Sequence, residues 1–237
     1  RRGMKQLLIL SGKGGTGKTT VAGAFIFLSQ AKAYADCDVD APNLHLISHR
    51  SSPPRRADYF GMPKAQIDSD KCIGCGACLS HCRFDAIEPG EPFRVKPFAC
   101  EGCGVCAAVC PAGAVSMGPS VAGELALYRD DTHVFSTAKL AMGSGTSGKL
   151  VTEVKKRMAS AAGNAELAVI DGSPGIGCPV IASISGADMV LIVAEPSLSG
   201  ISDMERIVKT VETFRTKTAV CVNKADVNPA KTEEIRA

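Results

Sequence analysis

The sequence lacks two features that would place the protein in a membrane or on nucleic acid. No apolar run approaches the length needed to span a bilayer, and the start of the chain has no apolar signal-peptide core. The 27 Lys and Arg against 24 Asp and Glu give a formal net charge of only +3, and the basic residues are scattered rather than clustered. We therefore expect a cytoplasmic protein with no membrane span and no nucleic-acid partner.

Cysteine, in contrast, is abundant, with 11 in 237 residues. In a secreted mini-protein this density would indicate disulfides. Here eight of the 11 fall between Cys72 and Cys110 in two runs of identical spacing, whereas Cys37, Cys178 and Cys221 stand apart. We assign Cys37 and Cys221 to packing within strands. The two runs instead indicate metal chemistry.

Each run has the spacing C-x2-C-x2-C-x3-C, which is the signature of bacterial ferredoxins with two [4Fe-4S] clusters. In that arrangement three close cysteines hold one cluster and the fourth reaches the other. Zinc also uses C-x2-C pairs, but runs of four argue against it. Arg83 stands where the first run often carries proline, a change that affects a turn and removes no ligand. The spacing therefore predicts one cluster on Cys72, Cys75, Cys78 and Cys110, and a second on Cys100, Cys103, Cys106 and Cys82.

Alternating strand and helix patterns flank the cysteine-rich stretch, which predicts an α/β fold with a mostly parallel sheet. A loop rich in Ser, Pro and Arg at 48–56 comes before the insert. We predict a discontinuous α/β domain formed by 1–60 and 119–237, with an α+β ferredoxin-like insert at 61–118. The chain stops at Ala237, just where another helix is expected to begin, so we expect a natural C-terminal portion to be missing. The expected strands are 6–10, 33–38, 167–170, 190–194 and 218–222, and the expected helices are 19–30, 150–162 and 202–214.

A phosphate-binding loop is predicted between the first strand and the first helix. Residues 12–19 fit G-x-x-x-x-G-K-[ST], and the flanking elements are those that the motif requires. Its glycines let backbone N–H groups wrap phosphates, Lys18 contacts the β and γ oxygens, and Thr19 ligates Mg²⁺. A glycine-rich turn without a ligand is the alternative, which the flanking strand and helix disfavour. The predicted nucleotide-binding residues here are Gly12, Lys13, Gly14, Gly15, Thr16, Gly17, Lys18, Thr19 and Thr20.

The stretch 13–20, K-G-G-T-G-K-T-T, has a second lysine and resembles the loop of the MinD/ParA family of ATPases. The resemblance implies ATP hydrolysis in a dimer closed by ATP, either a homodimer or a heterodimer with a similar ATPase. It also implies that Lys13 reaches the phosphates of the partner chain, so that Lys13 acts in catalysis together with Lys18.

Two further segments resemble the switch regions of that family. Asp36 and Asp38 match its switch I, where the first aspartate supports the magnesium site and the second orients the attacking water, and Asn43 matches a nearby family position. Turn formation is the alternative for these two aspartates. Asp171 ends a strand of Walker B type and would hold Mg²⁺ through water. The loop 172–177 resembles switch II, in which Gly175 matches the glycine that senses the γ-phosphate.

Residues 223–226, N-K-A-D, follow a strand and resemble a motif that recognises the nucleotide base. In related GTPases N-K-x-D reads guanine, whereas the loop at 13–20 indicates ATP. We favour ATP, keep GTP as the minority alternative, and place Asn223 and Lys224 among the nucleotide-binding residues.

Cys178 has two interpretations. It lies in the segment where nitrogenase iron proteins, which this region resembles, carry a ligand to a cluster shared between subunits. The alternative, which we favour, is a small buried thiol beside Pro179 that packs as an apolar residue.

The resemblance covers nearly the whole chain, which looks like a MinD-superfamily ATPase with an inserted ferredoxin domain. It implies ATP, Mg²⁺ and two [4Fe-4S] clusters as cofactors, and a redox or metal-cofactor protein as partner. Three functions stay open: an ATP-gated electron donor, a factor that assembles or delivers iron-sulfur or other metal cofactors, and a redox-sensing positioning or regulatory ATPase.

Overall fold

A computed structural model describes residues 3–47 and 52–237 of the chain. They divide into two compact units. The large unit contains residues of Arg1–Ala57, Leu125–Lys139 and Ser147–Ala237, and the small unit contains Asp58–Glu124 and Leu140–Thr146. In the described ranges no helix has the length and apolar character needed to cross a bilayer.

The main sheet has eight strands in the order β12-β11-β1-β10-β2-β9-β8-β3. Neighbouring strands from β12 to β9 pair in parallel, which agrees with the predicted α/β fold. A turn at 130–133 joins β8 to its neighbour β9, so these two strands run antiparallel. The strands are β1 (Lys5–Leu10), β2 (Ala33–Asp36), β3 (Arg55–Phe60), β8 (Val121–Arg129), β9 (Val134–Leu140), β10 (Leu167–Asp171), β11 (Met189–Ala194) and β12 (Lys217–Val222).

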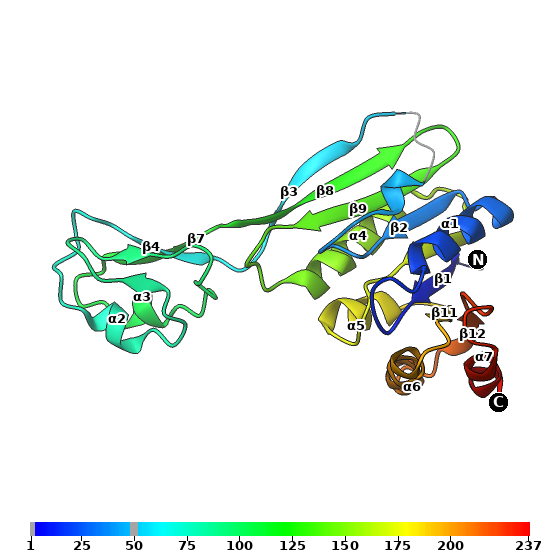
Figure 1. Cartoon of the computed structure of the whole chain (residues 1–237). Coiled ribbons are helices and arrows are strands. Elements are labelled where there is room, and N and C mark those ends of the chain that lie inside the picture. Colours follow the sequence, from blue (N-terminus) through cyan, green and yellow to red (C-terminus); the bar gives the residue numbers. More distant parts are fainter. Residues whose placement is uncertain (1–2, 48–51) are drawn as a thin grey trace. The chain divides into compact units, whose positions relative to one another are not determined.

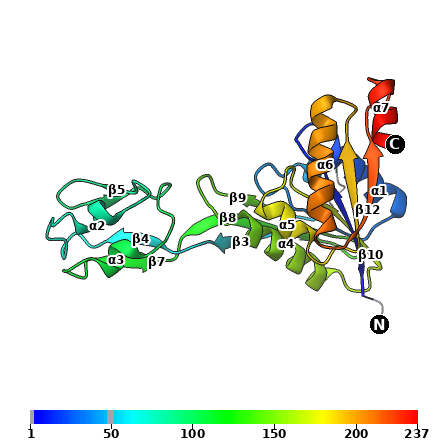
Figure 2. The same ribbon diagram turned by 90° about the horizontal axis from the view of Figure 1, so that it is seen from below.

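Helices cover both faces of the parallel part of this sheet. Figure 2 shows α1 on the side opposite α4, α5 and α6, as expected where crossover helices join parallel strands. The carboxyl ends of β1, β2 and β10 lie at one edge of the sheet, so the loops that follow them meet there. The helices are α1 (Lys18–Ser29), α4 (Ser147–Ala161), α5 (Cys178–Ile184), α6 (Leu198–Glu212) and α7 (Pro229–Arg236), with a short 3₁₀ turn η1 (Leu44–Leu46) (Figure 1).

The two faces of the sheet form two apolar layers because side chains alternate along a strand. Ile9 and Val169 pack with Ala22 of α1 in one core cluster. Leu8 and Ile170, one position along each strand, are also fully buried and point to the opposite face. The packed core of the sheet therefore supports the strand ends from which these loops start.

The small unit has short elements and little apolar core. Strand β4 (Lys64–Ile67) pairs antiparallel with β7 (Val115–Gly118), and β5 (Ile87–Glu88) pairs antiparallel with β6 (Arg94–Val95). Helices α2 (Ala77–His81) and α3 (Val105–Ala108) have only five and four residues. A domain this poor in core needs another source of stability, such as bound metal.

Several elements differ from the sequence prediction. Arg55 and Arg56 begin β3 and are not part of a loop, whereas 48–51 of the predicted loop lie outside the described residues. Helix α7 occupies Pro229–Arg236, so the expectation that a helix would begin only at the end of the chain is wrong. Strands β8 and β9 and helix α5 were not predicted.

Candidate functional site

The predicted phosphate loop forms the turn between β1 and α1. Gly15 and Gly17 have φ of 80° and 89°, in the left-handed region that favours glycine. A Cβ on Gly17 would collide with the side-chain amide of Asn223, so the backbone here must approach its neighbour closely. Thr16 is buried, and its hydroxyl has no partner among the described atoms. The helix starts at Lys18, which leaves its first N–H groups facing the loop.

Lys18 and Asp171 form a buried ion pair between the helix start and the end of β10. The side chains are 6% and 0% exposed, and the Lys18 ammonium bonds Oδ1 of the aspartate. The other oxygen, Oδ2, is buried and has no hydrogen-bond partner in the described part of the chain. A buried acceptor without a partner is costly, so this atom suits a cation or a bound water. The structure thus brings two of the predicted site residues together.

Asp36, at the end of β2, organises the loop that follows it. Its Oδ1 accepts from the backbone N–H of Asp38 at 3.0 Å, and its Oδ2 accepts from those of Asn43 and Leu44, both at 2.9 Å. Burial, and next the neighbouring carboxylate of Asp171, raise the pKa of Asp36 to about 7. A dication bound beside these two buried carboxyl groups would be stabilised by their oxygens.

Asp38, Asn43 and Thr19 lie at the same edge. Thr19 Oγ1 donates to Asn43 Oδ1 at 2.9 Å, which connects the phosphate loop to the segment after β2. Asp38 is half-buried, and burial raises the pKa of its carboxyl even though the charge of Lys18 acts to lower it. The predicted switch I residues therefore lie close to Thr19 and Asp36, two of the residues predicted to hold magnesium.

Lys13 and Lys224 both reach Glu195, which follows β11. The Lys13 ammonium lies 2.5 Å from Glu195 Oε1 and donates to Ser199 Oγ at 2.8 Å. Lys224 donates to the carbonyl of Gly15 at 3.0 Å and lies 3.4 Å from Glu195 Oε2. In the single chain, Lys13 is therefore held by an intramolecular ion pair.

The segment after β12 hydrogen-bonds the backbone of the phosphate loop. The side-chain amide of Asn223 donates to the carbonyl of Thr16 at 2.8 Å, next to the bond from Lys224 to the Gly15 carbonyl. These two residues therefore position the loop through its backbone. Asp226, the last residue of the predicted base motif, is exposed.

The loop 172–177 is hydrogen-bonded to both neighbouring strands. The N–H of Gly175 donates to the carbonyl of Ser11 at 3.0 Å, and Gly175 has φ of 94°. Ser173 Oγ donates to the carbonyl of Cys37 at 2.7 Å, and Cys37 N–H in turn donates to the carbonyl of Asp171 at 2.7 Å. The two predicted switch segments are thus joined at Cys37, which is fully buried as predicted.

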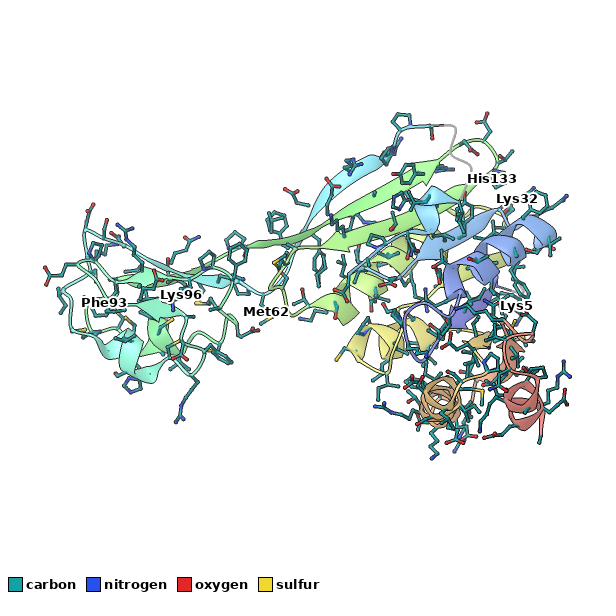
Figure 3. All side chains as sticks on the ribbon, in the orientation of Figure 1. Lys5, Lys32, Met62, Phe93, Lys96 and His133 are labelled. Carbon is teal, nitrogen blue, oxygen red and sulfur yellow. The ribbon has the colours of Figure 1, made fainter. Side chains whose placement is uncertain are left out.

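In the small unit the eight cysteines line two cavities. One cavity is lined by Phe93, labelled in Figure 3, together with the predicted first set, Cys72, Cys75, Cys78 and Cys110. The other is lined by Met117 together with the predicted second set, Cys82, Cys100, Cys103 and Cys106. The last cysteine of each run therefore lies with the first three of the other run, as the ferredoxin spacing predicts.

Backbone N–H groups point at several of these sulfurs. Cys110 Sγ accepts from the backbone N–H of Ala114 at 3.3 Å, and Cys82 Sγ accepts from that of Ala86 at 3.4 Å. In both cases the donor follows the cysteine by four residues. The bond from Ala114 lowers the pKa of Cys110, which favours the thiolate that binds iron. The same local geometry thus occurs twice, once at each cavity.

The cysteine geometry distinguishes a cluster from a single ion. Zinc needs its sulfur ligands all about 2.3 Å from one metal atom. Within 3–47 and 52–237, no three Cys, His, Asp or Glu side chains are placed to hold one metal ion. In an iron-sulfur cubane each thiolate binds a different iron, so the sulfurs stand farther apart around a cavity. The two cysteine sets fit [4Fe-4S] clusters better than zinc.

Solved structures with a similar fold include a MinD protein and a ParA family ATPase. The septum site-determining protein MinD of Pyrococcus horikoshii OT3, solved with Mg-ADP, is 16% identical, with a TM-score of 0.50 over 98% of this chain and 77% of that one. A ParA family ATPase from Chlorobium tepidum TLS is 14% identical, with a TM-score of 0.51 over 99% of this chain and 81% of that one. Identities this low show the fold alone.

Two sequence comparisons are more specific. Residues 65–117 match the family described as 4Fe-4S dicluster domain. The protein MJ0578 of Methanocaldococcus jannaschii is 32% identical over 234 residues, which are 94% of this chain and 79% of MJ0578. This chain belongs to the MJ0578 family. It combines a MinD/ParA-like P-loop ATPase fold with an inserted 4Fe-4S dicluster domain, as the sequence predicted.

In this MJ0578-family chain Cys178 does not pack as a buried thiol. It is exposed at the first position of α5, directly after the Gly177 cap, so the interpretation favoured from the sequence is wrong. Cys221 is partly buried against the core of the large unit, in line with its predicted packing role.

The sequence prediction missed Glu195, Ser173 and Phe93. Glu195 follows a parallel strand at its carboxyl end, where sites in such sheets are built, and this position could have drawn attention to it. Ser173 and Phe93 act through contacts between distant segments, for which the sequence of this MJ0578-family chain carries no signal.

Proposed function

We propose that the protein is a dimeric ATPase whose nucleotide state controls electron transfer through two [4Fe-4S] clusters. The observation that carries this proposal is that one chain has both a phosphate loop with a buried Lys18–Asp171 pair and two complete sets of four cysteines. Such a chain could use the free energy of ATP hydrolysis to change the redox properties of its clusters.

The nucleotide would lie against the phosphate loop, where backbone N–H groups of 12–19 and the start of α1 face its phosphates. Lys18 would leave Asp171 to contact the β and γ oxygens. Thr19 and Asp171 would hold Mg²⁺, with Asp171 acting through water, and Asp36 would support the site through the loop that its carboxylate organises. Asp38 would orient the attacking water.

ATP is the favoured nucleotide, and GTP stays the minority alternative. Asn223 and Lys224 already bond the carbonyls of Thr16 and Gly15, which supports a role in positioning the loop. Gly175, whose N–H now bonds Ser11, would exchange this bond for one to the γ-phosphate.

Dimer formation is part of the proposal. In a dimer closed by ATP, Lys13 would leave Glu195 and Ser199 and contact the phosphates of the partner chain. The partner chain would be a second copy or a similar ATPase, and a separate redox protein would accept or supply the electrons.

Electron transfer is favoured over cluster delivery because each cavity offers four cysteines, which complete the ligation of a [4Fe-4S] cluster. Clusters held this way are resident one-electron carriers. Cys75 and Cys103, the middle cysteines of the two triplets, are exposed, so each predicted cluster has a ligand at the surface for exchange with a partner.

Assembly or delivery of a metal cofactor is the second candidate, and exposed Cys178 is the observation that favours it. Cys178 residues of two chains would hold a further, labile cluster between them. In that case Cys178→Ala would remove iron beyond that of the two resident clusters and leave those two intact.

The test is anaerobic purification of the protein followed by iron and sulfide analysis, EPR of the reduced protein, and assay of Mg-ATP hydrolysis with and without reductant. We expect about eight iron atoms per chain, hydrolysis of ATP, and cluster potentials that change when ATP binds. Iron-poor protein or an absence of nucleotide binding would overturn the proposal. Clusters and hydrolysis that do not respond to each other would instead favour the regulatory alternative.

A further inference from the structure

Helices α4 and α5 of the large unit contact each other at two places, once through a close backbone approach and once through side-chain hydrogen bonds. At the start of α4, a Cβ on Gly148 would lie only 3.2 Å from the carbonyl oxygen of Cys178, so the helix backbones touch there. Farther along, the Lys155 ammonium donates to the carbonyls of Ser183 and Ser185 at the end of α5, both at 2.6 Å. These contacts couple the position of α4 to that of α5.

Helix α5 is attached directly to the nucleotide site. It begins at Cys178, immediately after the loop 172–177 that follows Asp171. The N–H of Gly175 in that loop donates to the carbonyl of Ser11, the residue just before the phosphate loop. If this bond is exchanged for a bond to phosphate, as in the proposed function, the loop would move, and α5 is the next element along the chain.

The start of α4, where Gly148 approaches Cys178, is also the point at which α4 joins the small unit, because the helix begins at Ser147, directly after Leu140–Thr146. Inside the small unit this segment packs on the loop that starts the second cysteine run. A Cβ on Gly143 would lie 3.1 Å from the Phe98 carbonyl oxygen, and one on Gly145 would lie 3.3 Å from a carboxylate oxygen of Glu101. Cys100, next to Glu101, lines the same small cavity as these two glycines.

The segment Leu140–Thr146 lies beside only one of the two cysteine sets. It shares a cavity with Cys100, the first ligand of the second set, and with Met62, labelled in Figure 3. The cavity of the first set is lined by Ile67, Ile73, Phe93 and other residues of 67–115, none of them from this segment.

We infer that α4 and α5 form a rigid arm through which the nucleotide state acts on one cluster, the one predicted on Cys82, Cys100, Cys103 and Cys106. This rests on the proposed function and specifies how it is regulated. Movement of the loop 172–177 shifts α5. The contacts of Gly148 and Lys155 with α5 then shift α4, and α4 displaces Leu140–Thr146, to which it is covalently joined. Hydrogen bonding and solvent exposure at the thiolates then change, which are two properties that set a cluster's reduction potential.

The experiment is an EPR-monitored redox titration of the whole reduced protein, with and without Mg and a non-hydrolysable ATP analogue. Serine substitutions Cys75→Ser and Cys103→Ser assign the two signals to their clusters. In the wild-type chain we expect the analogue to shift the potential of the cluster that includes Cys103 and to leave the other unchanged. Insertion of Gly-Ser-Gly between Thr146 and Ser147 should abolish this shift while iron content and analogue binding stay as in the wild type.

Two further variants test the arm itself. Lys155→Met removes the tie to α5 and should reduce the shift, whereas Lys156→Met, the same change at the next and exposed position, should leave it intact. The same insertion in the turn between Asp131 and Thr132 is the control for the added residues. An equal shift of both clusters, or a shift that survives the insertion after Thr146, overturns the inference. If neither wild-type cluster responds to the analogue, the proposed coupling itself is wrong.

Discussion

Asp36 and Asp171 occupy paired positions at the carboxyl ends of the adjacent parallel strands β2 and β10, and both are fully buried. This pairing makes the charge of the proposed nucleotide site depend on pH. The folded pKa of Asp36, about 7, lies above its value of 3.8 in an unfolded chain. The folded state therefore binds the proton more tightly, and this carboxyl makes the fold less stable as pH rises toward and through 7.

We expect the melting temperature of the magnesium-free protein to fall between pH 6 and 8.5 more steeply in the wild type than in Asp36→Asn. A folded pKa near 7 corresponds to about 1.4 kcal/mol over this interval, or about 2–4 °C. Circular dichroism at the two pH values gives the comparison. Asp188→Asn is the control, because a hydrogen bond from Lys5 lowers the pKa of Asp188 and that carboxyl stays ionised throughout. Equal slopes in the wild type and Asp36→Asn would contradict the expectation.

Removal of the Lys18 ammonium should stop hydrolysis without affecting the clusters. In Lys18→Ala we expect ATP turnover to fall by about 100-fold or more, as when a group that stabilises developing charge is lost. The variant also leaves Asp171 buried without its partner, so Lys18→Met with Asp171→Asn is needed as a folding control. Iron content and the EPR spectrum measure the small unit in the same samples. Loss of iron from a folded Lys18 variant would show that the two sites are not separate.

Substitution of Lys13 should slow ATP turnover and leave nucleotide binding unchanged. Lys13→Ala should bind a fluorescent ATP analogue about as tightly as the wild type does, but it should fail to form the ATP-dependent dimer and should hydrolyse ATP slowly. Sedimentation velocity with and without ATP measures the dimer. Lys32→Ala, at an exposed lysine after α1, is the matched control. Normal dimer formation by Lys13→Ala would rule out the proposed contact with the partner chain.

The assignment of cysteines can be tested by single substitutions at the crossed positions. Cys82→Ala should damage the cluster held by Cys100, Cys103 and Cys106, although Cys82 belongs to the first run in sequence. Cys110→Ala should damage the other cluster. EPR of the reduced variants distinguishes the two outcomes if Cys103→Ser provides the reference signal. A Cys82 variant that matches Cys75→Ser instead would mean that each run holds its own cluster.

Gly74 and Gly102 occupy equivalent positions in the two cysteine runs but have different surroundings. Both have positive φ, at 66° and 71°, so alanine costs roughly 1–2 kcal/mol at either position. A Cβ on Gly102 would also collide with the backbone carbonyl of Pro63, whereas one on Gly74 would meet nothing within 4 Å. We therefore expect Gly102→Ala to lose iron faster than Gly74→Ala when a chelator is added. Equal rates of iron loss would contradict this difference.

The phosphate loop and the cysteine sets were predictable because their chemistry is local. Residues 12–19 place four glycines, two lysines and two threonines within one loop, and each cysteine run places three predicted ligands within seven residues. The placement of each fourth cysteine in the cavity of the opposite run also followed from the spacing. Helix α7 carries a start signal in Asn228 and Pro229 that could have been used, since Asn228 caps the helix and proline is favoured at its first turn.

Other features depend on contacts that no local pattern records. Strand β9 buries Ser136 and Thr137, whose polarity hides the strand from an apolar pattern. Helix α5 has seven residues and starts in a glycine-rich loop, so it carries no helical period. The ion pair between Lys13 and Glu195 joins residues 182 positions apart, and only the assembled sheet brings them together. The exposure of Cys178 likewise follows from where α5 begins.

The exchange of Cys82 and Cys110 between the two cavities makes the halves of the insert mutually dependent. In the proposed arrangement each cubane takes three thiolates from one run and the fourth from the other, so a half-insert would leave an iron open to solvent and to oxygen. Assembly of the first cluster would draw in a ligand from the opposite run and so preform much of the second site. Maturation of this domain should therefore be cooperative, with apo and doubly loaded chains predominating over chains that carry a single cluster.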